Sequence, residues 1–344
     1  MAGSEVMEPA APGLVLAVDG GASKTDVWVI HPDGSILGTA RGAGSNHQLS
    51  GLDGAMDALG ATIGAALGAA GVDSTQRPSV GIGVYCMAGL DLPVDEERLV
   101  GAIASRQWSA RDLVHNDTMA VLRAGVRSGW GIGVVCGSGL NCVGLGPTGA
   151  VATFPSLGEL SGDFAAGGSW LGVRTLGLAL RSRDGRGGPT PLTMLVPAHF
   201  GLPDAEAVLG AVYSGEIGFG RLFELAQVCM ETASFGDPVA QGPVRFLAGE
   251  VVAMITAAAS RLGITDDEVE VVLGGGLFAT EYRTFTEWIE TGVRWSVPGA
   301  HLRPLEAAPV LGSALLGLDS LGAPPESATR LRSMAPAADP VDTI

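Results

Sequence analysis

The sequence predicts an α/β fold built in two domains. At 344 residues the chain is too long for one hydrophobic core of comfortable size. Hydrophobic residues make up 47% of it and aromatic residues only 5%, so its cores must consist of Ala, Val, Leu and Ile with much glycine, which suits helices packed closely on sheets. Short apolar segments that end in glycine-rich turns alternate with segments of helical periodicity, as expected of layered α/β proteins.

Charge and terminal composition exclude several classes of partner. The formal net charge of −16 argues against nucleic acid and anionic membrane surfaces, because both reward a basic face. Residues 1–13 carry glutamate and proline where a signal peptide would carry basic and apolar segments, and no stretch is expected to reach the length of a membrane span. The four cysteines show neither a CxxC pair nor zinc spacing, so we expect reduced, buried thiols in a cytoplasmic protein.

The first element is an apolar strand at residues 14–18 that runs into a polar turn. Further strands are predicted at 26–30 and 36–40. Two glycines let the turn's backbone bend and bring its N–H groups close to an anion, as in phosphate-binding loops. The turn reads Asp19-Gly20-Gly21-Ala22-Ser23-Lys24-Thr25 and contains the only lysine of the chain.

This turn is not a Walker loop. A Walker lysine needs a helix after it and glycines one and six residues before it, where Ser23 and Val18 stand. An ordinary β-hairpin with a polar tip remains the alternative.

The next segments alternate polar loops with regular elements. Residues 41–48 form a small, polar run that fits either a connecting loop or the lining of a polar cleft, where the Asn46 amide would offer a donor and an acceptor. Helices are predicted at 52–70 and 93–105, with a buried strand at 80–86 between them.

Asp117 follows a short strand at 112–115 and precedes a helix at 119–126. A helix N-cap would explain an aspartate at this position, and a catalytic carboxylate would explain it equally well. Ligands in open α/β sheets bind outside the carboxyl ends of the strands, and this location favours the functional interpretation.

A second strand–turn–strand pattern repeats the first. Strands at 131–136 and 140–145 flank Gly137-Ser138-Gly139, a glycine turn with one hydroxyl. A dinucleotide fingerprint is excluded because Cys142 stands at its third glycine and no helix follows. Two such hairpins could clasp a polyphosphate from two sides.

The rest of the chain carries a third polar turn and a third glycine run. Asp163 lies in a glycine-rich turn before a helix at 170–181. It fits either a structural N-cap or Asx turn, or a contact to a sugar hydroxyl or a hydrated metal. Mostly helical pattern runs from 192 to 263, and a strand at 270–273 ends in Gly274-Gly275-Gly276, which permits close approach of a ring or ribose to the backbone.

In this order, the motifs resemble the actin, hexokinase and Hsp70 superfold. More narrowly, the chain from about Leu14 to Leu318 resembles the N-acetylglucosamine kinase branch of the BadF/BadG/BcrA/BcrD ATPase family. The resemblance implies two ribonuclease-H-like domains with an interdomain cleft that close over ATP and Mg²⁺. It also implies a homodimer that transfers the γ-phosphoryl group to the 6-hydroxyl of an amino sugar, with N-acetylglucosamine expected and glucosamine or glucose as alternatives.

The resemblance assigns roles to the residues that match the family's motifs. Asp19 would hold Mg²⁺ through water, and Asp117 would accept the proton of the sugar's primary hydroxyl. The sugar would contact Ser45, Asn46, Asp117 and Asp163. ATP would contact Gly20, Gly21, Ser23, Lys24, Thr25, Gly137, Ser138, Gly139, Gly274, Gly275 and Gly276.

The same resemblance divides the chain into parts. The N-terminal domain is expected at 14–117 and the C-terminal domain at 118–304, with a closing helix at 305–321 that returns to the first domain. The segments 1–13 and 322–344 are expected to be disordered, the latter because Pro, Ala, Ser and Asp dominate it.

Two other functions compete with the kinase. Part of the family activates reductases and carries an iron–sulfur cluster between two subunits, which would need exposed cysteine ligands. A non-catalytic sugar or nucleotide sensor would bind ligand without releasing ADP. The family's usual Gly-Asp-Glu-Gly-Ser is replaced by Gly162-Asp163-Phe164-Ala165-Ala166-Gly167-Gly168-Ser169, a departure that leaves the identity of the hexose open.

Overall fold

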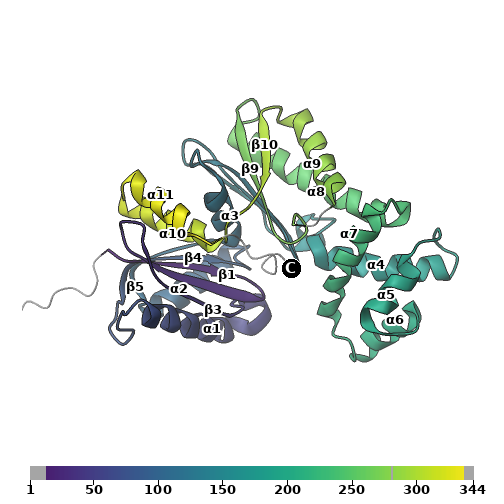
Figure 1. Cartoon of the computed structure of the whole chain (residues 1–344), viewed down its shortest axis with the longest axis horizontal. Helices are drawn as coiled ribbons and strands as arrows, with labels where there is room; N and C mark the ends of the chain where they lie inside the picture. The colour runs from purple at the N-terminus through teal and green to yellow at the C-terminus, as the bar shows by residue number, and fades with distance from the viewer. Residues whose placement is uncertain (1–12, 280–281, 337–344) are drawn as a thin grey trace, which may run out of the picture. The chain divides into compact units, whose positions relative to one another are not determined.

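The computed structural model describes residues 13–279 and 282–336, which divide into two compact units. Among these residues, the first unit comprises the chain up to Gly125 and again from Glu306, and the second comprises Val126–Leu305. Figure 1 labels the helices and strands of both units.

The first unit is built on a five-stranded mixed sheet. Its order is β3 (Ile36–Ala43), β2 (Lys24–Ile30), β1 (Val15–Gly20), β4 (Val80–Met87) and β5 (Ser109–Asn116). The first three strands form an antiparallel meander, while β4 pairs in parallel with both β1 and β5. All five predicted strands of this region are confirmed, and β1, β2 and β4 are almost entirely buried, as their apolar runs require.

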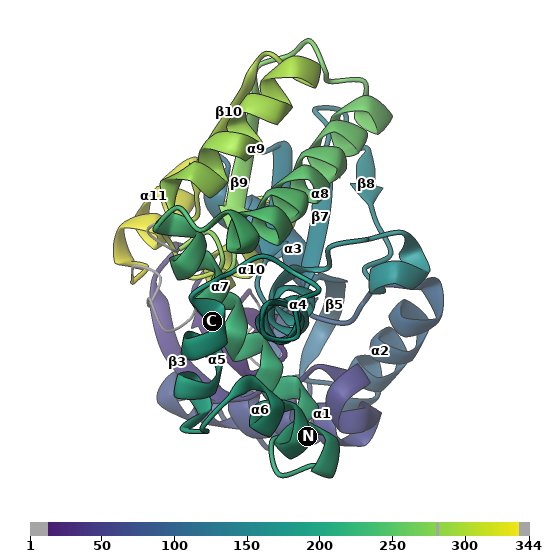
Figure 2. The ribbon, with the colours of Figure 1, turned by 90° about the vertical axis from the view of Figure 1, so that its right-hand side faces the viewer.

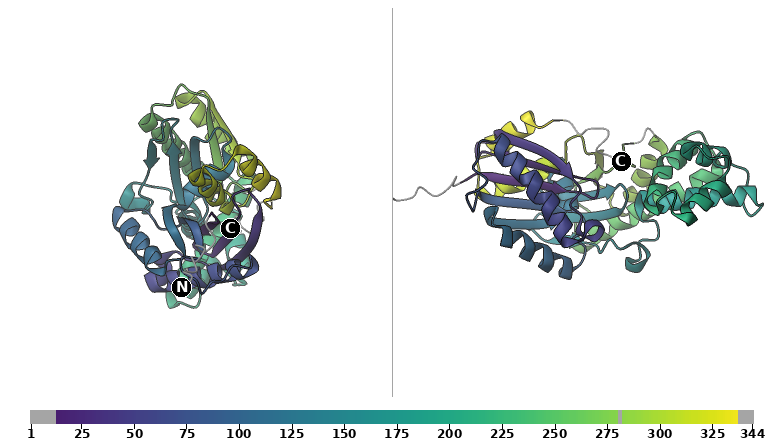
Figure 3. Two further views of the ribbon diagram at one scale, coloured as in Figure 1. Left: turned by 90° about the vertical axis from the view of Figure 1, so that its left-hand side faces the viewer. Right: turned by 90° about the horizontal axis from the view of Figure 1, so that it is seen from below.

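Helices cover both faces of this sheet. The helices α1 (His47–Ala69) and α2 (Pro93–Arg106) lie on one face, as Figures 1 and 3 show. Alternate residues of β1, Leu16 and Val18, share their buried cluster with these helices. The opposite face is covered by α3 (Asp117–Gly125) and α10 (Val310–Leu321).

The helix α3 belongs to the first unit, so this unit extends beyond the predicted boundary at residue 117. The reason is its close packing on α10: a Cβ atom added at Gly312 would lie 1.9 Å from the Ala120 carbonyl oxygen. Arg123 also donates two hydrogen bonds to Asp319, at 2.7 and 3.0 Å. Ser313 of α10 in turn donates a hydrogen bond to the carbonyl of Val18 at 2.8 Å.

The prediction that the chain is disordered from residue 322 onward is wrong for residues 325–334, which form the helix α11 (Pro325–Met334). Its composition is polar, but Leu331 and Ser327 are buried in the first unit, and Arg330 donates a hydrogen bond to Asp33 at 3.0 Å. Packing of one apolar position therefore outweighs a composition typical of disordered segments. The remaining predictions of disorder, at 1–12 and 337–344, lie outside the described residues.

The second unit repeats the sheet of the first. Its strand order is β8 (Val151–Thr153), β7 (Leu140–Leu145), β6 (Gly131–Cys136), β9 (Val269–Gly274) and β10 (Ala300–Pro304). Again three strands form an antiparallel meander and two follow in parallel. Both sheets thus have the ribonuclease-H-like order expected of the actin, hexokinase and Hsp70 superfold. Strands β8 and β10 were not predicted.

Six α-helices are described in the second unit. They are α4 (Gly167–Arg183), α5 (Leu192–Phe200), α6 (Ala205–Ser214), α7 (Leu225–Ser234), α8 (Pro238–Leu262) and α9 (Arg283–Ser296), with 3-10 turns at Gly158–Ser161 and Phe219–Glu224. Contrary to expectation, α8 is long and apolar enough to cross a membrane. Many of its apolar residues, however, lie in the core of the unit, although Phe246 is exposed. Figure 2 shows α8 beside α9 and β7.

Candidate active site

Asp19 lies at the end of the central strand of the first unit. In the sheet it is in register with Asp26 on β2 and Cys86 on β4, and only 9% of it is exposed. Space at the next residue is tight, because a Cβ atom at Gly20 would lie 2.6 Å from the hydroxyl of Ser45 and 2.7 Å from the sulfur of Met87. The fold therefore brings the Asp19 carboxylate to the edge where β1 ends, opposite Asp26 of β2.

The turn after Asp19 is closed by backbone hydrogen bonds. The Gly21 N–H donates to the Lys24 carbonyl at 2.9 Å, and the Ser45 N–H donates to the Gly21 carbonyl at 3.1 Å. Ala22 and Ser23 form the exposed tip. The loop after β3 is thus hydrogen-bonded to the base of the turn, and the tip is accessible to a ligand.

Lys24 is held beside a carboxylate. Its Nζ lies 3.6 Å from Oδ2 of Asp26. Arg41 donates one hydrogen bond to each carboxylate oxygen of Asp26, at 2.7 Å to Oδ1 and 3.0 Å to Oδ2. The only lysine of the chain therefore lies at the end of the turn and also takes part in an ion-pair cluster on β2. Its predicted contact with phosphate stays a prediction.

Thr25 and Ser45 have structural roles. Both are fully buried, Thr25 donates to the carbonyl of Ala43 at 2.8 Å, and the two hydroxyl oxygens are 2.8 Å apart. These contacts tie β2 to the following loop and use the hydroxyls inside the unit. We therefore do not carry forward Thr25 as a phosphate contact or Ser45 as a sugar contact.

Asn46 is the N-cap of α1. Its Oδ1 accepts a hydrogen bond from the N–H of Gln48 at 2.8 Å, which satisfies one of the unpaired donors of the first turn. The cap uses only the oxygen of the amide, so the NH₂ group is still able to donate to a ligand.

The structure shows which contacts surround Asp117 at the start of α3. The side-chain cap of α3 comes from Asn116, whose Oδ1 accepts from the N–H and the hydroxyl of Thr118 at 3.0 and 2.6 Å. Asp117 is partly buried, and burial together with the negative charge of Asp91 raises its pKa to about 6. Backbone N–H groups of Thr118 and of Asp117 itself act in the opposite direction and lower the pKa. A general base with a pKa near neutrality is suited to proton abstraction, and this role for Asp117 stays a prediction.

The second unit carries its own glycine turn. Between β6 and β7, the Gly137 N–H donates to the Gly139 carbonyl at 3.0 Å, while Ser138 and Gly139 are exposed. The start of α4 closes on this turn through Gly168, whose N–H donates to the Gly137 carbonyl at 2.8 Å. A Cβ atom at Gly167 would lie 2.3 Å from the Gly139 carbonyl oxygen. Sequence reasoning did not assign Gly167 and Gly168, although paired glycines before a helix indicate such a close approach.

The late glycine run meets the same edge of the second sheet. Gly275 has a φ of +98°, and a Cβ atom there would lie 2.6 Å from the carbonyl group of Cys136, at the end of β6. The Leu277 N–H donates to the Cys136 carbonyl at 3.0 Å. Two segments far apart in the sequence, 137–139 and 274–276, are therefore brought to neighbouring strand ends.

Asp163 is buried in the turn before α4. Its backbone N–H donates to the Gly158 carbonyl at 3.0 Å, and the hydroxyl of Ser161 donates to its carboxylate. These contacts fit a structural turn, and the predicted sugar contact stays a prediction.

The chemistry of the donors fits a magnesium ion that is held mainly by a bound phosphate. In the described parts of the chain, no cluster of three or more His, Cys, Asp or Glu residues could hold a metal by itself. Mg²⁺ usually keeps several waters and binds through one or two carboxylates plus substrate phosphates. The carboxylate of Asp19 lies beside an exposed glycine turn and matches that pattern, whereas the neighbouring Asp26 is paired with Lys24 and Arg41.

All four cysteines are free and buried. Burial raises the pKa of the Cys86 and Cys136 thiols to about 12, so neither forms a thiolate readily. Exposed ligands for a cluster shared by two subunits, which the reductase-activating function requires, are not provided by these positions.

Comparisons with known proteins agree with the motif order. The model of the BadF/BadG/BcrA/BcrD ATPase family matches residues 16–317. An N-acetyl-D-glucosamine kinase of Dictyostelium discoideum is 22% identical over 320 residues, which cover 89% of this chain and 98% of the relative. An N-acetylmuramic acid/N-acetylglucosamine kinase of Clostridium acetobutylicum is 26% identical over 263 residues, covering 76% of this chain and 85% of the relative.

A solved structure extends this similarity to three dimensions. A candidate N-acetylglucosamine kinase from Chromobacterium violaceum superimposes with a TM-score of 0.70 at 25% sequence identity. The match covers 89% of this chain and 99% of the other. The similarity therefore includes both units.

Proposed function

The chain belongs to the BadF/BadG/BcrA/BcrD ATPase family, and on this basis we propose that it is an ATP-dependent kinase for an amino sugar. The proposed reaction transfers the γ-phosphoryl group of ATP to the 6-hydroxyl of N-acetylglucosamine. The observation that carries the proposal is the environment of Asp117. This carboxylate is partly buried and has a raised pKa, and the neighbouring Asn116 side chain caps α3. The names of the relatives support the choice of sugar.

Proton transfer is the task of Asp117. As the 6-hydroxyl oxygen forms its bond to the γ-phosphorus and the bond to the β,γ-bridging oxygen breaks, the hydroxyl proton passes to the Asp117 carboxylate and ADP leaves. Phosphoryl transfer needs positioning and charge stabilisation more than covalent help, so one base and well-placed donors are sufficient. A positioned base typically contributes about 10²- to 10⁴-fold in rate.

The glycine turns serve as phosphate and nucleoside contacts. Exposed backbone groups of these turns, with Lys24 adjacent, would bind the phosphates, and the late glycine run would contact the adenosine. Asp19 would hold hydrated Mg²⁺, which neutralises phosphate charge when bound. Asn46 and Asp163 would contact sugar hydroxyls. The phosphate contacts are Gly20, Gly21, Ser23, Gly137, Ser138 and Gly139, and the adenosine contacts are Gly274, Gly275 and Gly276.

The proposal includes the setting of the enzyme. We place its activity in the cytoplasm, where ATP and free amino sugars are both present, and we expect a homodimer. Gel filtration with light scattering would test the oligomeric state.

The reaction is tested by identifying its product. Incubation with ATP, Mg²⁺ and N-acetylglucosamine is expected to yield the 6-phosphate, identified by its proton-coupled ³¹P NMR signal. The matched control is 6-deoxy-N-acetylglucosamine, which lacks only the attacking oxygen and should inhibit without being phosphorylated. Phosphorylation of the 6-deoxy sugar, or phosphate on the anomeric oxygen, would contradict the assigned site of transfer.

A further inference from the structure

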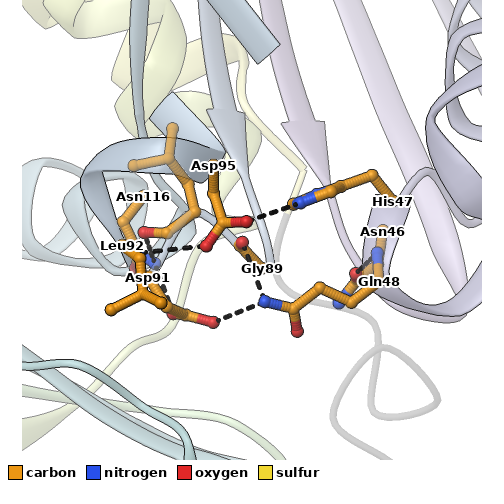
Figure 4. A network of polar contacts seen from close by, with 9 residues as sticks. Asn46, His47, Gln48, Gly89, Asp91, Leu92, Asp95 and Asn116 are labelled. Carbon is orange, nitrogen blue, oxygen red and sulfur yellow. Dashed lines mark hydrogen bonds and ion pairs between the residues drawn. The ribbon is translucent and has the colours of Figure 1, made fainter. Parts of the chain in front are cut away.

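Asp91 joins the two segments of the first unit that the proposed function assigns to the sugar. Its Oδ2 accepts a hydrogen bond from Gln48 Nε2 at 3.1 Å, and its Oδ1 lies 3.5 Å from Asn116 Nδ2 (Figure 4). We propose that Asp91 is a positioning residue for phosphoryl transfer, which fixes the start of α1 relative to Asp117. The inference deepens the proposed function and rests on it.

On one side, Gln48 connects α1 to the loop between β4 and α2. Its backbone N–H is bonded to the cap residue Asn46, and its side chain donates to both the Gly89 carbonyl and Asp91, each at 3.1 Å. Movement of this loop would therefore move the first turn of α1. That turn begins next to Asn46, the proposed sugar contact.

On the other side, Asn116 connects the same loop to α3. Its NH₂ group donates to the Leu90 carbonyl at 3.0 Å and faces Asp91, while its oxygen caps α3 at Thr118. Asp117 stands between the capping residue and the capped residue. The loop thus controls where the backbone of Asp117 lies.

A second polar contact joins α1 to α2 and does not involve Asp91. His47 Nε2 lies 3.2 Å from Oδ1 of Asp95, and both side chains are about nine-tenths buried. The other oxygen of Asp95 accepts from the Leu92 N–H at 3.1 Å. Because this contact joins α1 to α2 independently, substitution of Asp91 is expected to shift the loop without unfolding the unit.

Asp91 also acts on Asp117 through its charge. A like charge nearby disfavours the ionised form of a carboxyl, so removal of the Asp91 charge should lower the pKa of Asp117. Surrounding strands and helices contribute further ionisable groups, which remain unchanged in the variant. They are Asp19 on β1, Cys86 on β4, His115 on β5, Asp95 and Glu96 on α2, and Asp319 on α10, which is bonded to Arg123.

The test compares three variants in the kinase reaction. For Asp91→Asn we expect kcat to fall about tenfold, because displacement of a reacting group is costly. The wild-type kcat/KM should fall as pH is lowered through about 6, where Asp117 becomes protonated, and in this variant the fall should occur at lower pH. Gln48→Ala should raise KM for the sugar without moving the acid limb. The control Asp53→Asn removes an exposed charge on α1 and should leave both quantities unchanged.

A readout without substrate separates this inference from the proposed function. Titration of the Asp117 carboxyl by ¹³C NMR, assigned with Asp117→Asn, should give a lower pKa in Asp91→Asn than in the wild type. A folded Asp91→Asn variant with wild-type kcat, acid limb and titration would overturn the positioning role. If the wild type phosphorylates no sugar, the proposed function fails, and an unchanged titration would then also refute the action of Asp91 on Asp117.

Discussion

Asp117 is a carboxylate whose ionised form lowers the stability of the fold. Contacts that favour an ionised carboxyl lower its pKa, whereas burial and the charge of Asp91 raise that of Asp117 from 3.8 to about 6. Asn116 meanwhile makes the cap that would have given Asp117 a structural purpose. The ionised Asp117 side chain disfavours folding, and Asn116 caps the helix instead. Residues with such perturbed pKa values are often functional.

Asp117→Asn is therefore expected to raise stability and remove turnover together. Above pH 6 the aspartate is ionised in both the folded and the unfolded state. In the folded state, desolvation and repulsion from Asp91 then lower the free energy of unfolding. As pH falls through 6 towards 4, the folded state takes up the proton first and this penalty disappears. Thermal unfolding should give a higher Tm for the variant at pH 7 and a smaller difference near pH 4.5, and sugar phosphorylation should fall by about 10²-fold or more. A lower Tm at pH 7 with retained turnover would show that Asp117 is structural.

Single residues were the hardest feature to predict from the sequence. The motif contained Thr25 and Ser45 as hydroxyls suited to a ligand, but both are buried and bonded within the unit. The pattern also allowed Asp117 to be the cap, because the choice between adjacent polar residues depends on backbone angles that composition does not specify. Asp19 and Asp117 were nevertheless correctly placed at the ends of β1 and β5. The apolar run before Asp19 stops at the carboxylate, and the helix after Asp117 marks the end of β5.

At the scale of elements, the glycine loops of the second unit depend on close backbone contacts. Gly275 is the clearest example, because it combines a positive φ with a Cβ position 2.6 Å from the Cys136 backbone. No side chain fits there unless the loop moves away from the end of β6. The same movement would change the proposed nucleotide contacts.

Gly275→Ala should therefore weaken ATP binding. We expect the Kd for ATP to rise about tenfold or more, measured by isothermal titration calorimetry, because the loop must shift to admit the methyl group. Gly249→Ala is the matched control, since Gly249 is exposed on α8 with open space around its Cβ position, and alanine favours a helix by about 1 kcal/mol. Equal affinities for ATP in the two variants would remove the loop from the proposed site.

Strands and helices were easier to predict where their apolar pattern is stronger. The central strands β1, β4, β6 and β9 are nearly continuous apolar runs and were located correctly. The edge strands β8 and β10 are short and partly exposed, so their sequences give little periodic signal. The helix α11 was missed because it is held by tertiary contacts rather than by composition.

At the scale of the molecule, the chain consists of one sheet topology used twice. In both units an antiparallel meander of three strands comes first and two parallel strands follow. The chain crosses between units at Gly125–Val126 and again at Leu305–Glu306. The two glycine hairpins occupy equivalent positions, β1–β2 and β6–β7. This repetition was visible in the sequence as two strand–turn–strand motifs, and the family match covers both copies.

The central claim is that this molecule couples ATP cleavage to a sugar hydroxyl. The most direct test measures ADP release with ATP and Mg²⁺ against a panel of N-acetylglucosamine, glucosamine and glucose, beside a control without sugar. We predict release that depends on sugar and is greatest with N-acetylglucosamine. Release at the same rate without any sugar would contradict the claim and indicate an activator ATPase, and binding of ATP and sugar without release would indicate a sensor.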